Sequence, residues 1–91
     1  MIVKERDMTD EMVTPCYVIG DKHVTYQDDW CYGRSMMLGS KPLDDVEARQ
    51  WIKAHIRECP EERNGLPLYY VSDHGNVHKA RAIRLRRVQA S

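Results

Sequence analysis

The stretch that decides the fold spans residues 15–26 and reads PCYVIGDKHVTY. Its two halves are rich in β-branched and aromatic residues, and Gly20 and Asp21 separate them. A glycine in the first central position suits a two-residue type II′ turn. The stretch therefore predicts a β-hairpin, and this turn would place Tyr17 opposite Val24.

Alternation along the two strands divides the side chains of this hairpin between two faces. One face carries two tyrosines and two branched aliphatic residues: Tyr17, Ile19, Val24 and Tyr26. The other face carries Cys16, Val18, His23 and Thr25. We expect Tyr17 and Tyr26 to lie in the core.

The clearest helix signal lies between Leu43 and Cys59. Asp44, with Glu47 three residues later, forms a capping-box sequence at the start of a helix. The less polar residues recur at helical spacing on one face: Ala48, Trp51, Ile52, His55, Ile56 and Cys59. Pro60 cannot continue the helix, so we predict that it ends there.

Shorter strands are expected on either side of this helix. Residues 35–38 (SMML) indicate a third strand. After a loop at 61–65, residues 68–71 (LYYV) are typical of a strand, and Gly75 can supply the positive φ of a tight turn before a return strand from Val77. This order predicts an α+β fold, with one antiparallel sheet of four to five strands and one helix packed on one face.

The C-terminal stretch leaves two interpretations open. Ala80 and Ala82 alternate with basic residues, whereas Ile83 and Leu85 have the opposite parity. Either a bulge shifts the phase of a long strand, which we favour, or the tail from residue 83 to 89 is helical.

The 91 residues are predicted to form one domain, 1–91, with residues 1–12 as a loose arm or a weak first strand. No apolar run is long enough to span a membrane, and residues 1–7 have no apolar signal core and carry acidic residues where a signal peptide would not. The three cysteines are an odd number, so we expect reduced thiols. These features predict a cytoplasmic protein, in the host cytoplasm if a phage encodes it.

The formal net charge is zero, with 14 basic and 14 acidic residues, but the two signs are not evenly spread. Residues 1–30 hold three basic and seven acidic residues, whereas residues 79–91 hold five basic residues and no acid. The C-terminal basic residues are candidates for contact with phosphates or an acidic partner: Lys79, Arg81, Arg84, Arg86 and Arg87. The alternative is that they only protect a solvated strand edge from unwanted pairing.

A second candidate contact surface surrounds Trp30. Trp30 and Tyr32 are large side chains on a predicted loop, and Arg34 follows them. Tryptophan, tyrosine and arginine dominate the energetics of protein interfaces. Met36 and Met37 add an adaptable apolar surface. We therefore predict that Trp30, Tyr32 and Arg34 bind a partner.

Residues 69–79 read YYVSDHGNVHK. This segment resembles the strand-turn-strand signature of a modular DNA-binding motif that accompanies HNH-type homing endonucleases in phages, in which Tyr-x-Val-Ser-x-x-Gly-x-Val recurs. The resemblance covers 11 of the 91 residues, and His78 stands where the family carries a basic residue. It implies a hairpin that touches DNA and a phage-like context, and it supplies no catalytic residue.

The sequence offers little support for catalysis or for a bound metal. It contains no Cys-x-x-Cys pair and no phosphate-binding glycine loop. The sequence spacing between Cys31 and His55 or His74 gives no support for a nucleophilic cysteine paired with a histidine base. We predict that the protein is not an enzyme and that it has no cofactor and no metal site.

We therefore expect a non-catalytic binding protein. The leading hypothesis is a small phage or mobile-element accessory protein that inhibits a host defence or nucleic-acid machine by occupying a protein surface, in the manner of an anti-CRISPR factor. Its partner would be a larger protein or protein complex, including a nucleoprotein. The alternative is a small nucleic-acid-binding module that uses the basic C-terminal hairpin, residues 69–88. A free strand edge also allows a homodimer.

Overall fold

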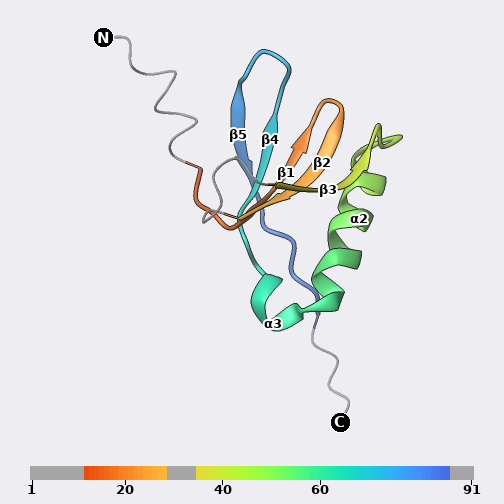
Figure 1. The fold of residues 1–91 in the computed structure, drawn as a ribbon, viewed down its shortest axis with the longest axis vertical. Helices are drawn as coiled ribbons and strands as arrows, with labels where there is room; N and C mark the ends of the chain where they lie inside the picture. Colours follow the sequence, from red (N-terminus) through yellow and green to blue (C-terminus); the bar gives the residue numbers. More distant parts are fainter. Residues whose placement is uncertain (1–11, 29–34, 87–91) are drawn as a thin grey trace.

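The computed structural model describes residues 12–28 and 35–86, and its centre is a five-stranded sheet crossed by one main helix (Figure 1). The strands are β1 (Cys16–Gly20), β2 (His23–Gln27), β3 (Ser35–Ser40), β4 (Leu68–Val71) and β5 (Val77–Ala80). The helices are α2 (Asp45–Glu58) and α3 (Pro60–Arg63). The strands lie in the order β3-β2-β1-β4-β5, so β3 and β5 form the two borders of the sheet. The predicted α+β fold is confirmed.

One strand pair differs from the expected fully antiparallel sheet. β1 and β4 run parallel, with Tyr17 opposite Leu68, and the tips of the two hairpins point the same way (Figure 1). Between them the chain forms β2 and β3 and then returns along the sheet as α2. A parallel pair needs such a crossover, because a tight turn can only reverse the chain.

The first hairpin has the predicted faces in a different register. Tyr17 lies opposite Tyr26 instead of Val24. The turn consists of Asp21 and Lys22, one residue later than predicted. The later turn shifts every pairing by two residues, and a shift of two keeps each side chain on its predicted face.

The helix α2 begins and ends close to the predicted residues. The Asp44 side chain accepts a hydrogen bond from the backbone N–H of Glu47 at 2.9 Å, and the Glu47 carboxylate accepts one from the backbone N–H of Leu43 at 2.7 Å. Pro60 ends α2 and begins α3, where we expected a loop, because proline fits the first turn of a helix. No helix in the described part of the chain has the length and apolar character that a membrane span requires.

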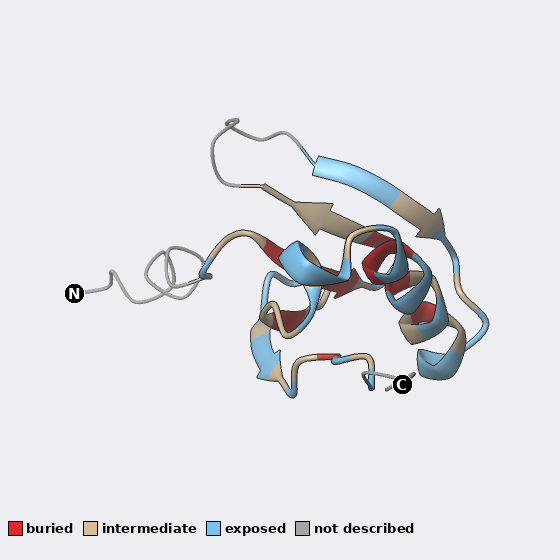
Figure 2. Ribbon diagram, turned by 90° about the horizontal axis from the view of Figure 1, so that it is seen from below, coloured by how far each residue is buried: buried red, intermediate tan, exposed pale blue. Residues whose placement is uncertain are grey.

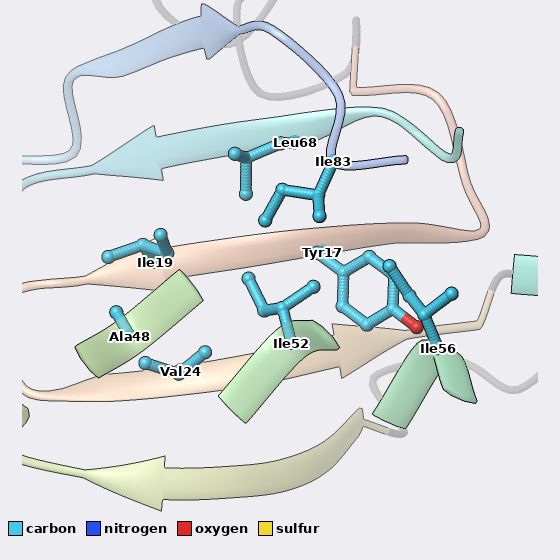
Figure 3. Close-up of a cluster of buried hydrophobic side chains, with 8 residues drawn as sticks. All are labelled: Tyr17, Ile19, Val24, Ala48, Ile52, Ile56, Leu68 and Ile83. Carbon is cyan, nitrogen blue, oxygen red and sulfur yellow. The ribbon is translucent and has the colours of Figure 1, made fainter. Parts of the chain in front are cut away.

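The main core lies between the sheet and α2 (Figures 2 and 3). Its buried members come from three strands, the helix and the C-terminal segment: Tyr17, Ile19, Val24, Ala48, Ile52, Ile56, Leu68 and Ile83. A smaller cluster lies on the other face of the sheet and contains Cys16, Val18 and Tyr69. Tyr69 is buried in this second cluster, with 5% of its surface exposed.

The chain after β5 is neither of the two predicted elements. β5 ends at Ala80, and residues 81–86 form no regular strand or helix. Ile83 enters the core, and the side chain of Asn64 forms two hydrogen bonds with the backbone of Leu85, at 2.6 and 3.3 Å. The change of parity before Ile83 therefore marks the point where the chain has left the sheet to pack beside the α2–α3 end.

Candidate partner-binding surfaces

The residues predicted to bind a partner fall into two groups. Trp30, Tyr32, Arg34 and Arg87 lie outside the described residues. The other four are described and all are exposed: Lys79, Arg81, Arg84 and Arg86. We call these four residues the basic rim, because they follow the border strand β5 and the segment after it.

The basic rim begins on β5 and continues into the segment that packs near α3. Lys79 lies opposite Tyr69, so its side chain is on the sheet face away from α2. Further along, the Arg84 side chain lies close to Gly65, where an added Cβ would be 3.0 Å from a guanidinium nitrogen. Arg86 lines a cleft beside α3. Lys79 thus lies on the sheet face away from α2, whereas Arg84 and Arg86 lie near α3.

The cleft at the end of the basic rim has a mixed charge. It has a volume of about 580 Å³ and lies where α2, α3 and the C-terminal segment meet. Glu58, Glu61 and Glu62 line it together with Arg86. A nucleic-acid backbone that approached Arg86 would meet these three carboxylates, and the like charges would repel each other. The Arg86 end of the rim therefore suits a protein surface of mixed charge better than a phosphate backbone.

The strand β3, at the other border, forms a second candidate surface. Its sequence is SMMLGS, and Met36 and Met37 are 53% and 57% exposed. It contains neither a charged residue nor a proline, but its pairing with β2 has a register shift between Val24 and Thr25, and a bulge of this kind is one of the features that protect a border strand from pairing. The opposite border strand, β5, contains Lys79 and leads into the arginines. The two borders of the sheet therefore differ in chemistry.

An apolar groove of about 310 Å³ lies between β3 and α2. Its lining combines three apolar strand residues with residues of α2: Met36, Met37, Leu38, Trp51, Ala54, His55 and Glu58. Gly39 lets the Trp51 ring approach the strand, because an added Cβ at Gly39 would be 2.5 Å from two carbons of the ring. Sequence reasoning missed this groove, and the signal that could have found it is the glycine within the strand.

A buried polar pair lies beneath the groove. The Tyr17 hydroxyl and His55 Nδ1 are 2.8 Å apart, and the two residues are 1% and 6% exposed. Burial, and then the charge of Arg63, lower the pKa of His55, and His55 Nε2 has no hydrogen-bond partner. Burial raises the pKa of Tyr17. Because a general base must reach its substrate, this arrangement fits a role in packing.

The two described cysteines are free thiols. Cys16 is fully buried, and burial raises the pKa of its thiol to about 11, so it stays protonated at neutral pH. Cys59 is half-buried at the start of α3. Within residues 12–28 and 35–86, no group of three or more His, Cys, Asp or Glu side chains could hold a metal ion. Cys31 lies outside the described residues.

No protein-family model, curated protein or solved structure matches this chain. Residues 69–79 do form a hairpin, in which Gly75 has a φ of 83° as expected. Its resemblance to a DNA-binding motif stays a prediction.

Proposed function

We propose that this chain is a non-catalytic binding protein whose basic rim occupies a surface of a larger protein that is acidic opposite Lys79 and Arg81 and of mixed charge opposite Arg86. The observation that carries the proposal is the run of four exposed cations on β5 and on the segment that follows it, Lys79, Arg81, Arg84 and Arg86. No acidic residue lies between Asp73 and Arg86 in the sequence. Such a run gives complementary attraction to an acidic patch and speeds the encounter.

The attachment of the C-terminal segment supports this role. Ile83 is buried in the core, and Asn64 holds the backbone of Leu85 from both its N–H and its carbonyl group. Arg84 and Arg86 flank these anchored residues, so their backbone positions are fixed before a partner arrives. Binding then costs less conformational entropy than it would from an unattached tail.

The proposed setting is the one that the sequence favours. The protein would be a small phage or mobile-element accessory protein in the host cytoplasm, and its partner would be a host defence complex or another nucleic-acid machine. Inhibition would follow from covering a surface that the machine needs, in the manner of an anti-CRISPR factor, and would need no catalytic step.

The second candidate is a nucleic-acid-binding module that uses the same rim. Lys79 and Arg81 lie at the hairpin that resembles the phage DNA-binding motif, and this placement favours the candidate. The three glutamates beside Arg86 count against it. Affinity for unrelated DNA sequences that falls steeply with salt would support this second candidate over the first.

A pull-down from a bacterial lysate, with and without nuclease, tests both candidates. The bait is compared with Arg81→Glu/Arg84→Glu and with a matched control, Lys53→Glu/Arg57→Glu, which reverses two exposed charges on α2. We expect one protein complex that survives nuclease, is lost with the rim variant and is retained by the control.

Two results would contradict the leading proposal. Loss of every partner after nuclease treatment would show that the rim binds nucleic acid. Equal retention by the rim variant and the control would exclude the rim as the contact.

A further inference from the structure

We propose that the groove between β3 and α2 binds a small, neutral and mainly apolar molecule whose carbonyl oxygen accepts a hydrogen bond from His55 Nε2. The groove has a volume of about 310 Å³, at the lower end of the range for small-molecule sites. It lies beside β3, whereas the basic rim begins on β5 at the opposite border of the sheet. The groove and the rim can therefore act independently.

The lining of the groove suits an apolar ring. Met36, Met37 and Leu38 come from β3, and Trp51 and Ala54 come from α2. A methionine side chain is flexible, and its sulfur makes favourable contacts with aromatic rings, while an indole ring offers a large surface for stacking. Met36 and Met37 are each more than half exposed, so a ligand that covers them removes apolar surface from water.

His55 adds a polar group to this apolar site, and its neighbours on the sheet orient its ring. His55 Nδ1 lies 2.8 Å from the Tyr17 hydroxyl, and the His55 and Tyr26 ring centres are 4.8 Å apart. Tyr17 is on β1 and Tyr26 is on β2, while β3 lies beyond β2. Because the two nitrogens of an imidazole ring point away from each other, Nε2 faces β3 and the groove, which His55 lines.

The hydrogen bond with Tyr17 determines which nitrogen of His55 carries the proton. Burial, and then the charge of Arg63, lower the pKa of His55, so at neutral pH the ring holds one proton. Burial raises the pKa of Tyr17, so its hydroxyl keeps its proton. If Nδ1 donated, the hydroxyl proton and Nε2 would both lack a partner among the described residues, whereas a donating hydroxyl leaves only Nε2–H without one. The second arrangement costs less, because it leaves one buried polar group unpaired instead of two.

His55 Nε2–H is therefore a buried donor that faces the groove and has no acceptor in the described part of the chain. The Nδ1 bond serves packing, and Nε2 remains for a ligand whose carbonyl oxygen would remove the cost of the unpaired donor. Nε2 is closed to solvent, so the flexible methionine side chains of β3 would move aside as the ligand enters. A carboxylate would lose its hydration in an apolar groove that Glu58 also lines, so a neutral acceptor fits better.

Titration of the full chain with acetophenone, followed by ¹H–¹⁵N NMR, tests this inference. Acetophenone joins an aromatic ring to a carbonyl group, and isopropenylbenzene has the same shape with a methylene group in place of the carbonyl oxygen. We expect both compounds to shift the signals of groove residues and acetophenone to bind about tenfold more tightly. Acetophenone should also move the resonance of the His55 Nε2 proton downfield.

Variants of two neighbouring positions on α2 test the location. Ala54 is exposed and lines the groove, so Ala54→Trp should fill the groove and abolish binding. Lys53→Trp adds the same side chain at an exposed position outside the lining, and it should bind acetophenone as the wild type does. Tyr17→Phe/His55→Phe removes the donor, so the difference in affinity between the two compounds should disappear.

Three results would overturn the proposal. An absence of any shift with acetophenone up to its solubility limit would exclude the site. Equal affinities of the wild type for acetophenone and isopropenylbenzene would exclude His55 Nε2–H as the donor. Unchanged binding by Ala54→Trp would show that the compounds bind elsewhere.

Discussion

At the scale of single residues, His55 links folding to pH. Its ring is buried against Tyr17, and burial together with the charge of Arg63 holds the pKa below its ordinary value of 6.5. When the folded pKa is the lower one, the unfolded chain binds the proton first as the pH falls. The contribution of His55 to stability is therefore complete above about pH 6.5 and declines below it.

Urea unfolding above and below this pH checks the prediction. The free energy of unfolding of the wild type should fall between about pH 7 and pH 5. The double variant Tyr17→Phe/His55→Phe removes the titrating ring together with the hydroxyl that it pairs with. Its free energy of unfolding should fall less than that of the wild type between about pH 7 and pH 5. If the free energy of unfolding depended on pH equally in the two proteins, groups other than His55 would be responsible.

The contact between Gly39 and Trp51 is the second feature at this scale. A Cβ at Gly39 would be 2.5 Å from two ring carbons, so Gly39→Ala should push β3 and α2 apart and cost about 1–3 kcal/mol. Gly75→Ala is the comparison, because no atom lies within 4 Å of its added Cβ and only the positive φ opposes it, at about 1 kcal/mol. Chemical unfolding of both variants measures the difference. A Gly39→Ala protein as stable as the wild type would show that the ring can move aside.

At the scale of elements, Asn64 attaches the segment after β5 to the end of α3. Its side chain accepts a hydrogen bond from the Leu85 N–H at 2.6 Å and donates one to the Leu85 carbonyl at 3.3 Å. Asn64→Ala should cost about 1 kcal/mol and accelerate hydrogen exchange at the Leu85 amide. Asn64→Asp keeps the shorter of the two bonds and should protect the Leu85 amide better than Asn64→Ala does. Equal exchange in all three proteins would mean that packing of Ile83 alone holds the segment.

The hairpin and the helix were predictable because their signals are local. Alternation assigned Tyr17 and Tyr26 to the correct face even though the turn lies one residue later than expected, since a face depends only on parity. Asp44 and Glu47 identified the start of α2 for the same reason: a cap is formed within one turn of chain.

The features that sequence reasoning missed depend on residues far apart in the chain. Nothing in β1 or β4 alone indicates that they pair in parallel, because the direction follows from the path of the whole crossover. Tyr69 is buried by a cluster on the second face of the sheet, and Ile83 by a helix more than 20 residues earlier. The groove likewise combines β3 with α2, so only its glycine could have indicated it.

At the scale of the whole molecule, the sheet separates two surfaces. The basic rim follows the β5 border, and the uncharged strand β3 forms the other.

The basic rim is predicted to be separable from the stability of the fold. Arg81→Glu/Arg84→Glu should reduce partner capture while the free energy of unfolding in urea stays within about 0.5 kcal/mol of the wild type, because both side chains are exposed. A clearly larger loss of stability in this variant would show that the two arginines also hold the fold.

The late position of Ile83 in the core has a consequence for synthesis. A nascent chain that has emerged only as far as α3 already holds the first hairpin, β3 and α2, but β4 and Ile83 are still to come. Until they arrive, one edge of β1 lacks its parallel neighbour and the core lacks the side chains of Leu68 and Ile83. On the ribosome, we therefore expect the nascent domain to gain its full cooperativity only after the segment beyond β5 has emerged.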